Sequence, residues 1–403
     1  MNNYKKNCTS IFENKCTGCG ICYQICPCNA IIMKQDKEGF LKPIVNNELC
    51  INCQKCLYYC EKYFKQSKLK SNIIEVKACQ TKDPLWLIES TAGGFFPTLA
   101  QWVIENNGVV FGTAWDDTME PIICKASSIE EIRKFNGSKY VQSDIHHALS
   151  EIKEELKRGV MVLFSGTPCQ NAAVKTFCYD INTENLITLD VICYGVPSPG
   201  LFKAYIKTIE NKRNVKVVDF RFRDKHKYGW SHTTVIYTEN KNGKVSKFIE
   251  KDYRKIPYYQ MFSKRNCFRK SCYNCNYNTI NRITDFTTGN FWGIENLTSS
   301  FNLYNGVSLV LINTEKAKII YNTIISRISS IDMTIDQAIL SNDALIRSTP
   351  YPSDRDQIYE YFINNGFMKM YEKYYKINYF KTIINNIKRK LKNIYKFAKL
   401  KNM

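Results

Sequence analysis

Eight cysteines near the N-terminus carry the clearest chemical signal in the sequence. They form two runs with the spacing C-x2-C-x2-C-x3-C, made of Cys16, Cys19, Cys22, Cys26 and of Cys50, Cys53, Cys56, Cys60. Thiolates at this spacing are typical ligands of iron–sulfur cubanes, which move single electrons. The alternative is zinc, because paired C-x2-C knuckles also hold tetrahedral Zn²⁺. A zinc ribbon does not require the same four-cysteine run twice, so the repeat favours two [4Fe-4S] clusters.

The double run resembles a two-cluster bacterial ferredoxin. In that arrangement the fourth cysteine of each run binds the cluster of the other run. One cluster would then take Cys16, Cys19, Cys22 and Cys60, and the second would take Cys50, Cys53, Cys56 and Cys26. We therefore predict a 2x[4Fe-4S] ferredoxin module over residues 1–66. A module of this size buries little core, so the clusters would stabilise it.

A second group of cysteines lies in the middle of the chain. Cys267, Cys272 and Cys275 form C-x4-C-x2-C, which gives three soft ligands in one stretch. A metal centre here needs a fourth ligand, which Cys169 or Cys193 can supply. The alternative is chance clustering in a cysteine-rich protein. For Cys169 two further alternatives are a nucleophile at a helix N-terminus, where thiol pKa values fall, and an inert buried thiol.

Alternating strand and helix patterns would position these cysteines. Predicted strands over 159–164 and 186–192 end in SGTPCQ and CYGVPS, and a helix follows each. The carboxyl ends of strands in open α/β sheets are where ligands collect, with helix N-termini facing negative charge. Small-residue loops at 90–94 and 166–170 let backbone N–H groups approach a diphosphate, although ordinary turns are the alternative. Neither loop matches a dinucleotide fingerprint or a P-loop.

Other segments give weaker structural signals. Helices are predicted over 95–105, 128–135 and about 143–158, strands over 108–113, 215–222 and 306–312, and a hairpin over 233–248 turned at Asn242-Gly243. His226 and His232 flank Gly229-Trp230 in a loop. They are candidates for a substrate pocket, and the alternative is a place on the surface.

Composition sets limits on the class of protein. A length of 403 residues with 44% hydrophobic and 23% charged residues predicts two to three globular domains. The N-terminus has no apolar signal region, and no apolar run is long enough to span a membrane. Eighteen cysteines kept reduced for cluster ligation favour a cytoplasmic protein.

Several motifs, taken in order, resemble the coenzyme F420 hydrogenase/dehydrogenase beta-subunit family. They are GSKYVQS, GTPCQ, CYGVPSP, RFRDK with a following Gly-Trp, C-x2-C before a TD segment, and GNFWGIE, within about residues 85–310. The resemblance implies an α+β protein in which an α/β flavin-binding domain with a mixed sheet follows the ferredoxin module. We expect an N-terminal-like beta-subunit region over 67–155, a C-terminal-like flavin and iron–sulfur region over 156–325, and a helical tail over 326–403.

The resemblance also implies particular site residues. FAD would lie near Ser90, Gly93, Gly94, Gly137, Ser138, Lys139, Tyr140, Gln142, Gly166, Thr167 and Cys169. A third [4Fe-4S] cluster would lie where the family concentrates its internal cysteines, at Cys193, Cys267, Cys272 and Cys275. Two positions depart from the family: Tyr194 replaces a common His, and Asn290 replaces a common Asp. Because both groups that carry protons are lost, no catalytic residue is assigned.

The function that the resemblance implies is an iron–sulfur flavoprotein oxidoreductase. A ferredoxin- or flavodoxin-type donor would reduce the clusters, and electrons would reach FAD and then an organic acceptor. Similar fused forms resemble proteins encoded with polysaccharide biosynthesis genes, so we expect an acceptor of that kind rather than coenzyme F420. The alternatives are a non-catalytic electron-transfer beta subunit of a hydrogenase/dehydrogenase complex and an F420-dependent oxidoreductase.

The C-terminal tail is strongly basic. Residues 366–403 hold eleven Lys or Arg and one acid, a net charge of +10 out of +20 for the chain. From about residue 377, apolar residues recur at helical spacing between the lysines, which predicts a basic amphipathic helix. Such a helix can lie on the inner membrane surface, dock on a protein surface, or bind nucleic acid. Nucleic acid is disfavoured because no aromatic residues interleave a basic groove.

Overall fold

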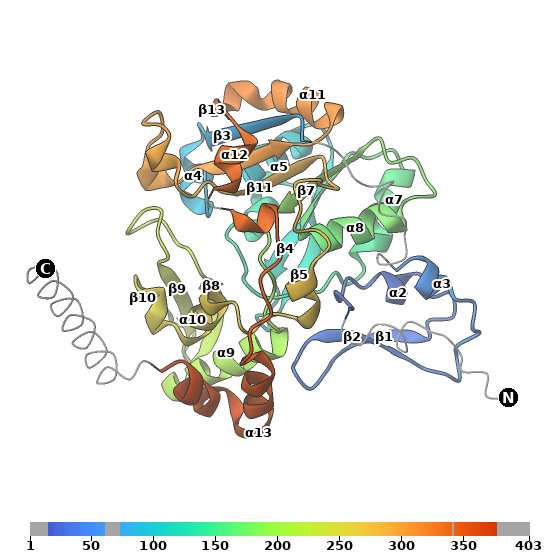
Figure 1. Ribbon diagram of the computed structural model, residues 1–403, viewed down its shortest axis with the longest axis vertical. Coiled ribbons are helices and arrows are strands. Elements are labelled where there is room, and N and C mark those ends of the chain that lie inside the picture. The colour runs from blue at the N-terminus through green and yellow to red at the C-terminus, as the bar shows by residue number, and fades with distance from the viewer. Residues whose placement is uncertain (1–14, 61–72, 341, 377–403) are drawn as a thin grey trace, which may run out of the picture.

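The computed structural model describes residues 15–60, 73–340 and 342–376 (Figure 1). Within these ranges the largest element is an eight-stranded mixed sheet in the order β13-β3-β12-β11-β7-β6-β4-β5. Its strands are β3 (Glu75–Thr81), β4 (Val109–Trp115), β5 (Pro121–Ala126), β6 (Val162–Gly166), β7 (Leu186–Val191), β11 (Phe286–Asn290), β12 (Ser308–Ile312) and β13 (Ile328–Met333). Strands β4, β6, β7 and β11 run parallel, and each of the other four pairs antiparallel with its neighbours.

Helices cover both faces of this sheet because successive strand side chains point to opposite sides. Val110 and Leu163 belong to the apolar cluster that contains α5 (Phe95–Glu105) and α11 (Glu315–Ile324). Their neighbours Phe111 and Phe164 belong to the cluster that contains α7 (Ala148–Lys157) and α8 (Pro168–Phe177). Shorter helices complete the layers: α4 (Pro84–Glu89), α6 (Ile129–Ile132) and α12 (Ile335–Ile339).

A second, three-stranded antiparallel sheet lies below the large sheet in Figure 1. It consists of β8 (Lys216–Arg221), β9 (Thr234–Glu239) and β10 (Val245–Glu250), and it packs with α9 (Pro199–Arg213), α10 (Pro257–Lys264) and α13 (Arg355–Tyr374). The shared core is rich in aromatic rings, such as Phe202, Phe220 and Tyr258. Helix α13 is interrupted at Gly366, whose φ of 78° is not helical.

The N-terminal module lies against the α7 side of the body (Figure 1). It contains α2 (Ile21–Gln24), α3 (Lys55–Tyr58) and a hairpin of β1 (Ile31–Gln35) and β2 (Leu41–Val45). Ile21 is buried in the cluster formed by α7 and α8. At the other end of the module, the guanidinium of Arg355 donates to both carboxylate oxygens of Glu38. In the described part of the chain, no helix is both long and apolar enough to cross a membrane.

Most predicted elements are present, with shifted ends. The helix over 95–105 and the hairpin over 233–248 are confirmed. The helix expected from about residue 143 begins at Ala148, because the Asp144 backbone pairs with Pro121 and Ile123 instead. Likewise the strand expected from 159 begins at Val162, since Gly159 adopts a turn with a φ of 76°.

The large sheet does not follow the expected boundaries at 155/156 and 325/326. It draws strands from both sides of the first boundary, so these regions form one structural unit. Directly after the second boundary, β13 pairs with β3, where a helical tail was expected. Helical structure returns with α12 and α13. The predicted basic helix from about 377 lies outside the described residues.

Candidate functional site

A cavity of about 630 Å³ lies at the carboxyl edge of the parallel strands, between the two sheets. The ends of strands β4, β6, β7 and β11 supply Thr113, Thr167, Cys193 and Asn290. The strand ends meet here because parallel strands place their carboxyl ends at one edge. The opposite wall includes Arg223 and His232 from the β8–β9 connection, and Tyr259 from α10. The volume falls within the range of about 300–1,000 Å³ that cofactor pockets occupy.

Most residues expected near a flavin line this cavity. They are Ser90, Gly94, Gly137, Ser138, Lys139, Tyr140, Gly166 and Thr167. The lining does not include Gly93, Gln142 or Cys169. A Cβ on Gly93 would lie 2.1 Å from the carbonyl oxygen of Cys79, so this glycine lets the loop pack on β3. Gln142 instead donates from Nε2 to the carbonyl oxygen of Thr17, 3.0 Å away.

Polar atoms on the cavity wall are suited to a polar ligand. Within the described residues, Ser90 Oγ and Asn136 Oδ1 are buried and have no hydrogen-bond partner. Lys139 donates to the carbonyl oxygens of Lys134 and Asn136 at 3.0 and 3.1 Å. Burial lowers the pKa of Lys139 to about 8. Ser90 Oγ can donate to a phosphate, whereas Asn136 Oδ1 can only accept, for example from a hydroxyl or a ring N–H, so this wall fits a polar cofactor such as FAD.

A second, smaller cavity brings four thiols together. It is lined by Cys169 at the start of α8, Cys193 after β7, and Cys272 and Cys275 in and after a 3-10 turn at Lys270–Asn274. Burial raises the pKa of Cys193, and the nearby Cys272 and Cys275 raise it further. Four cysteines are the donor set of a [4Fe-4S] cluster.

No three Cys, His, Asp or Glu side chains in the described ranges converge on one point, as the ligands of a single metal ion would. The thiolates of a cubane bind separate iron atoms, so they need not converge in this way.

One cysteine of the C-x4-C-x2-C stretch, Cys267, does not line this cavity. Cys267 is fully buried in the aromatic core of the small sheet, where its carbonyl oxygen accepts from Tyr359 Oη at 2.6 Å. The bridge between Pro197 and Phe268 diverts the chain between Cys267 and Cys272. Cys169, which was expected near the flavin and was also one of the two candidates for a fourth ligand, lines the thiol cavity together with the other candidate, Cys193.

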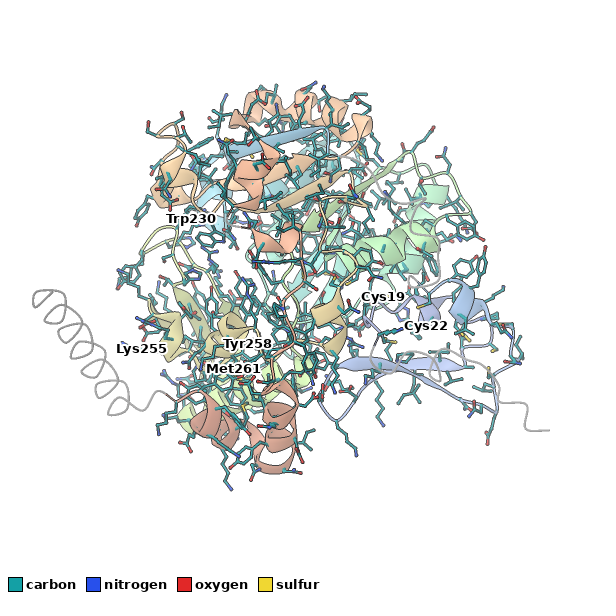
Figure 2. All side chains as sticks on the ribbon, viewed as in Figure 1. Cys19, Cys22, Trp230, Lys255, Tyr258 and Met261 are labelled. Atoms are coloured by element: carbon teal, nitrogen blue, oxygen red, sulfur yellow. The ribbon has the colours of Figure 1, made fainter. Side chains whose placement is uncertain are left out.

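In the N-terminal module, one small cavity is lined by Cys26, Cys50, Cys53 and Cys56, the set that the crossed ferredoxin pattern predicts. Cys28 lines the same cavity, and its Sγ lies 3.7 Å from Cys26 Sγ. The run spacing does not predict this fifth thiol, but the Cys-Pro-Cys sequence at residues 26–28 places it close to Cys26. Cys19 lies where the module meets the body, near Cys22 on α2 (Figure 2).

The first cysteine run lies beside the internal thiol group. Thr17 lines the cavity of the four internal cysteines. Arg269 donates from Nε to the carbonyl oxygen of Cys16 at 2.6 Å and from Nη1 to Gln142 Oε1 at 3.0 Å. Cys193, in turn, lines both the thiol cavity and the large cavity. The module, the internal thiols and the large cavity thus follow one another in space.

Aromatic rings form the far wall of the large cavity. Trp292 stacks on Trp230 with ring centroids 4.9 Å apart, and His232 lies nearly parallel to Trp292 at 5.6 Å. Trp230, labelled in Figure 2, donates from Nε1 to Asn290 Oδ1 at 3.0 Å. Burial and the nearby Arg223 lower the pKa of His232 to about 4. Of the two candidate histidines, His232 lines the cavity, whereas His226 is half-exposed and pairs with Asp224.

Two separate stretches of the chain are similar to known protein families. Residues 160–333 match the family model for the C terminus of the beta subunit of coenzyme F420 hydrogenase/dehydrogenase, and residues 15–63 match the 4Fe-4S dicluster domain. The F subunit of the F(420)H(2) dehydrogenase of Methanosarcina mazei is 23% identical over 195 residues, which are 45% of this chain and 54% of that protein. The match thus spans about half the length of this curated relative.

A solved structure of the F420-reducing [NiFe] hydrogenase complex from Methanosarcina barkeri contains a similar chain. It is 17% identical, with a TM-score of 0.44, and the match covers 75% of this chain and 91% of that chain. The family assignment depends on the sequence matches to the two models. Residues 15–63 are thus similar to a 4Fe-4S dicluster domain, and residues 160–333 are similar to the C terminus of the coenzyme F420 hydrogenase/dehydrogenase beta subunit.

Proposed function

We propose that this iron–sulfur electron-transfer protein works as a beta-type subunit, which carries electrons between its N-terminal clusters and a two-electron carrier. The single observation that supports the proposal most is the position of Cys193, which lines both the thiol cavity and the large cavity. Thr17 supports the other end of the path, because it lies next to Cys16 and lines the same thiol cavity. A cluster held there would have the dicluster domain on one side and the large cavity on the other.

The cofactor we propose for the large cavity is FAD. When bound, it supplies the exchange between one-electron clusters and two-electron carriers. The chain's part is to hold it: Gly94 and Gly166 lie in the cavity lining, and Ser90 Oγ and Asn136 Oδ1 are free to bond it. Tyr194 and Asn290 line the cavity where the family commonly has groups that carry protons. These two side chains can form hydrogen bonds, but neither is a suitable proton donor or acceptor for catalysis. Protons would therefore enter with the carrier or from water.

The identity of the carrier follows from the relatives only by analogy. Their names associate this family with F420 chemistry, so a deazaflavin is the first carrier to test. The expectation of an acceptor from polysaccharide biosynthesis has no support in the comparisons. As a beta-type subunit, the chain would serve a separate catalytic protein or a soluble ferredoxin- or flavodoxin-type donor.

Anaerobic reconstitution of the full chain tests the proposal. We expect about 12 iron atoms per chain for three cubanes and bound FAD with an oxidised-flavin spectrum. Chemically reduced protein should pass electrons to a deazaflavin, and it should not transform other organic acceptors without a partner protein. Bound zinc with iron near zero would contradict the proposal. Turnover of an organic substrate by the isolated chain would instead favour an independent enzyme.

A further inference from the structure

The far wall of the large cavity carries a buried positive charge. Arg223 is 5% exposed and lines the cavity just after β8. Its Nε donates to the carbonyl oxygen of Ser231 at 3.1 Å, and its Nη2 has no hydrogen-bond partner within the described residues. The guanidinium carbon lies 4.6 Å from the centre of the Trp292 ring. Neither contact neutralises the charge.

The nearby carboxylates are already engaged elsewhere. Asp224 accepts from His226 Nδ1 at 3.0 Å and lies 3.6 Å from Arg221 Nη1. Asp219 accepts from Arg221 Nε at 2.8 Å. Among the described residues, no ion pair joins Arg223 to an acid. A buried cation without a counter-charge is unfavourable, and a bound anion would relieve this.

The rest of the wall has the same sign of charge. In the part of the chain that the structure describes, no Asp or Glu lines this cavity, whereas Arg223, Arg265 and Lys139 do. Arg265 lies over the ring of Tyr194, with its guanidinium carbon 4.0 Å from the ring centre. Lys225 Nζ donates to the carbonyl oxygens of Ala92 and Asn305 at 2.8 and 2.6 Å, close behind the wall. Because Arg265 pairs with Asp343 at 3.4 Å, the preference for a negatively charged ligand rests on the unpaired guanidinium of Arg223.

We propose that Arg223 anchors a phosphate or carboxylate group of the carrier that exchanges electrons in this cavity, so the carrier is an anionic molecule. This inference deepens the proposed function and rests on it. A guanidinium suits both groups because its planar donors can bond two oxygens at once. Arg223 and the small-residue loops line the same cavity, so the test must separate an exchanging carrier from a resident cofactor.

Binding of inorganic phosphate to the full chain tests this without any electron transfer. Titration calorimetry on the reconstituted protein, with and without FAD, should show a phosphate site in both forms. Arg223→Gln should weaken phosphate binding at least tenfold, because it removes the charge. Arg223→Lys keeps a point charge and should weaken binding less. Arg221→Gln is the matched control, because Arg221 pairs with Asp219 and does not line the cavity, and it should bind like the unchanged protein.

Each other outcome would overturn the inference. Equal phosphate affinity in the Gln variant, or no phosphate binding by the unchanged protein, would show that Arg223 anchors no anion. Loss of phosphate binding on FAD addition would assign Arg223 to the resident cofactor rather than to the exchanging carrier. Iron content is measured on the same samples and tests the proposed function separately. Phosphate binding involves no electron transfer, so the two proposals can fail independently.

Discussion

At the scale of single residues, sulfur positions decide which thiols can hold iron. Cys26 and Cys28 have sulfurs 3.7 Å apart and line one cavity with the second cysteine run. Either thiol is therefore in reach of the same corner of a cluster. Cys60, the predicted crossed ligand of the other set, is followed in the sequence by Glu61 and Lys62 rather than by a second cysteine.

The Cys26–Cys28 pair gives the first prediction. Cys26→Ser should keep its full iron content, because Cys28 takes the vacant corner, whereas Cys26→Ser with Cys28→Ser should lose iron from that cluster. Iron analysis and electron paramagnetic resonance of the reduced proteins measure this. Cys28→Ser alone is the control and should keep all iron. Loss of about four irons from Cys26→Ser alone would contradict the prediction.

His232 gives a prediction about pH. Its pKa is lowered to about 4, by burial and then by Arg223, from about 6.5 in an unfolded chain. The unfolded chain thus binds the proton first as pH falls. The contribution of neutral His232 to the free energy of unfolding is fully present above about pH 6.5, and it is lost as the pH falls through about 4.

We expect His232→Gln to lack this part of the acid destabilisation. Between these two pH values, the unchanged protein should lose about 1–2 kcal/mol more than the variant, after allowance for partial solvent screening. Denaturant unfolding of both proteins, side by side at each pH, measures the difference. Parallel stability curves for the two proteins would contradict the account of His232.

At the scale of elements, the loop between α4 and α5 must lie close to the sheet to shape the cavity. A Cβ on Gly93 would lie 2.1 Å from Cys79 O and 2.6 Å from Ser308 N, which are backbone atoms of β3 and β12. Gly93→Ala should therefore destabilise the fold by about 1–3 kcal/mol and weaken FAD binding. Thermal unfolding and flavin titration measure these effects.

Gly159→Ala is the control for this loop. Gly159 has a positive φ of 76°, but an added Cβ would meet nothing within 4 Å. It should cost about 1–2 kcal/mol from backbone strain and leave flavin affinity unchanged. If Gly93→Ala bound FAD normally, the loop could not depend on this close contact.

Elements also show how far the sequence could predict the site. The strand ends and small-residue loops of the cavity were predictable, because hydrophobic runs ended by Gly, Thr and Pro mark the carboxyl edge. The polar strand β13 was not, because it forms only by pairing with β3. Spacing alone could not predict that Cys272 lines the thiol cavity while Cys267 lies in the aromatic core. The difference depends on the bridge between Phe268 and Pro197, which are distant in sequence.

At the scale of the whole molecule, a buried ion pair fixes the module to the body. Arg355 is fully buried at the start of α13, and its Nη1 donates to Glu38 Oε1 at 2.7 Å in the module hairpin. Arg269 and Gln142 hold the same module at Cys16 and Thr17. These contacts keep the first cysteine run beside the internal thiols.

Glu38→Gln should therefore loosen the module. It leaves Arg355 buried with only Asp356 as a charged partner among the described residues, so we expect a loss of about 3 kcal/mol. Protease sensitivity of the module and chemical denaturation measure this loss. Glu48→Gln, at an exposed site of the same module, is the control and should behave like the unchanged protein. Equal stability of both variants would mean that the ion pair does not hold the module.

We propose that electrons cross the internal thiol centre on their way to the large cavity. The test is the rate of flavin reduction in a stopped-flow experiment, in which a reduced ferredoxin supplies electrons to the N-terminal module. The two variants to compare are Cys272→Ser and Cys267→Ser. We predict that Cys272→Ser loses about four irons and reduces its flavin at least a hundredfold more slowly, while Cys267→Ser keeps its iron and its rate. Unchanged flavin reduction in Cys272→Ser, or equal losses in both variants, would contradict the account.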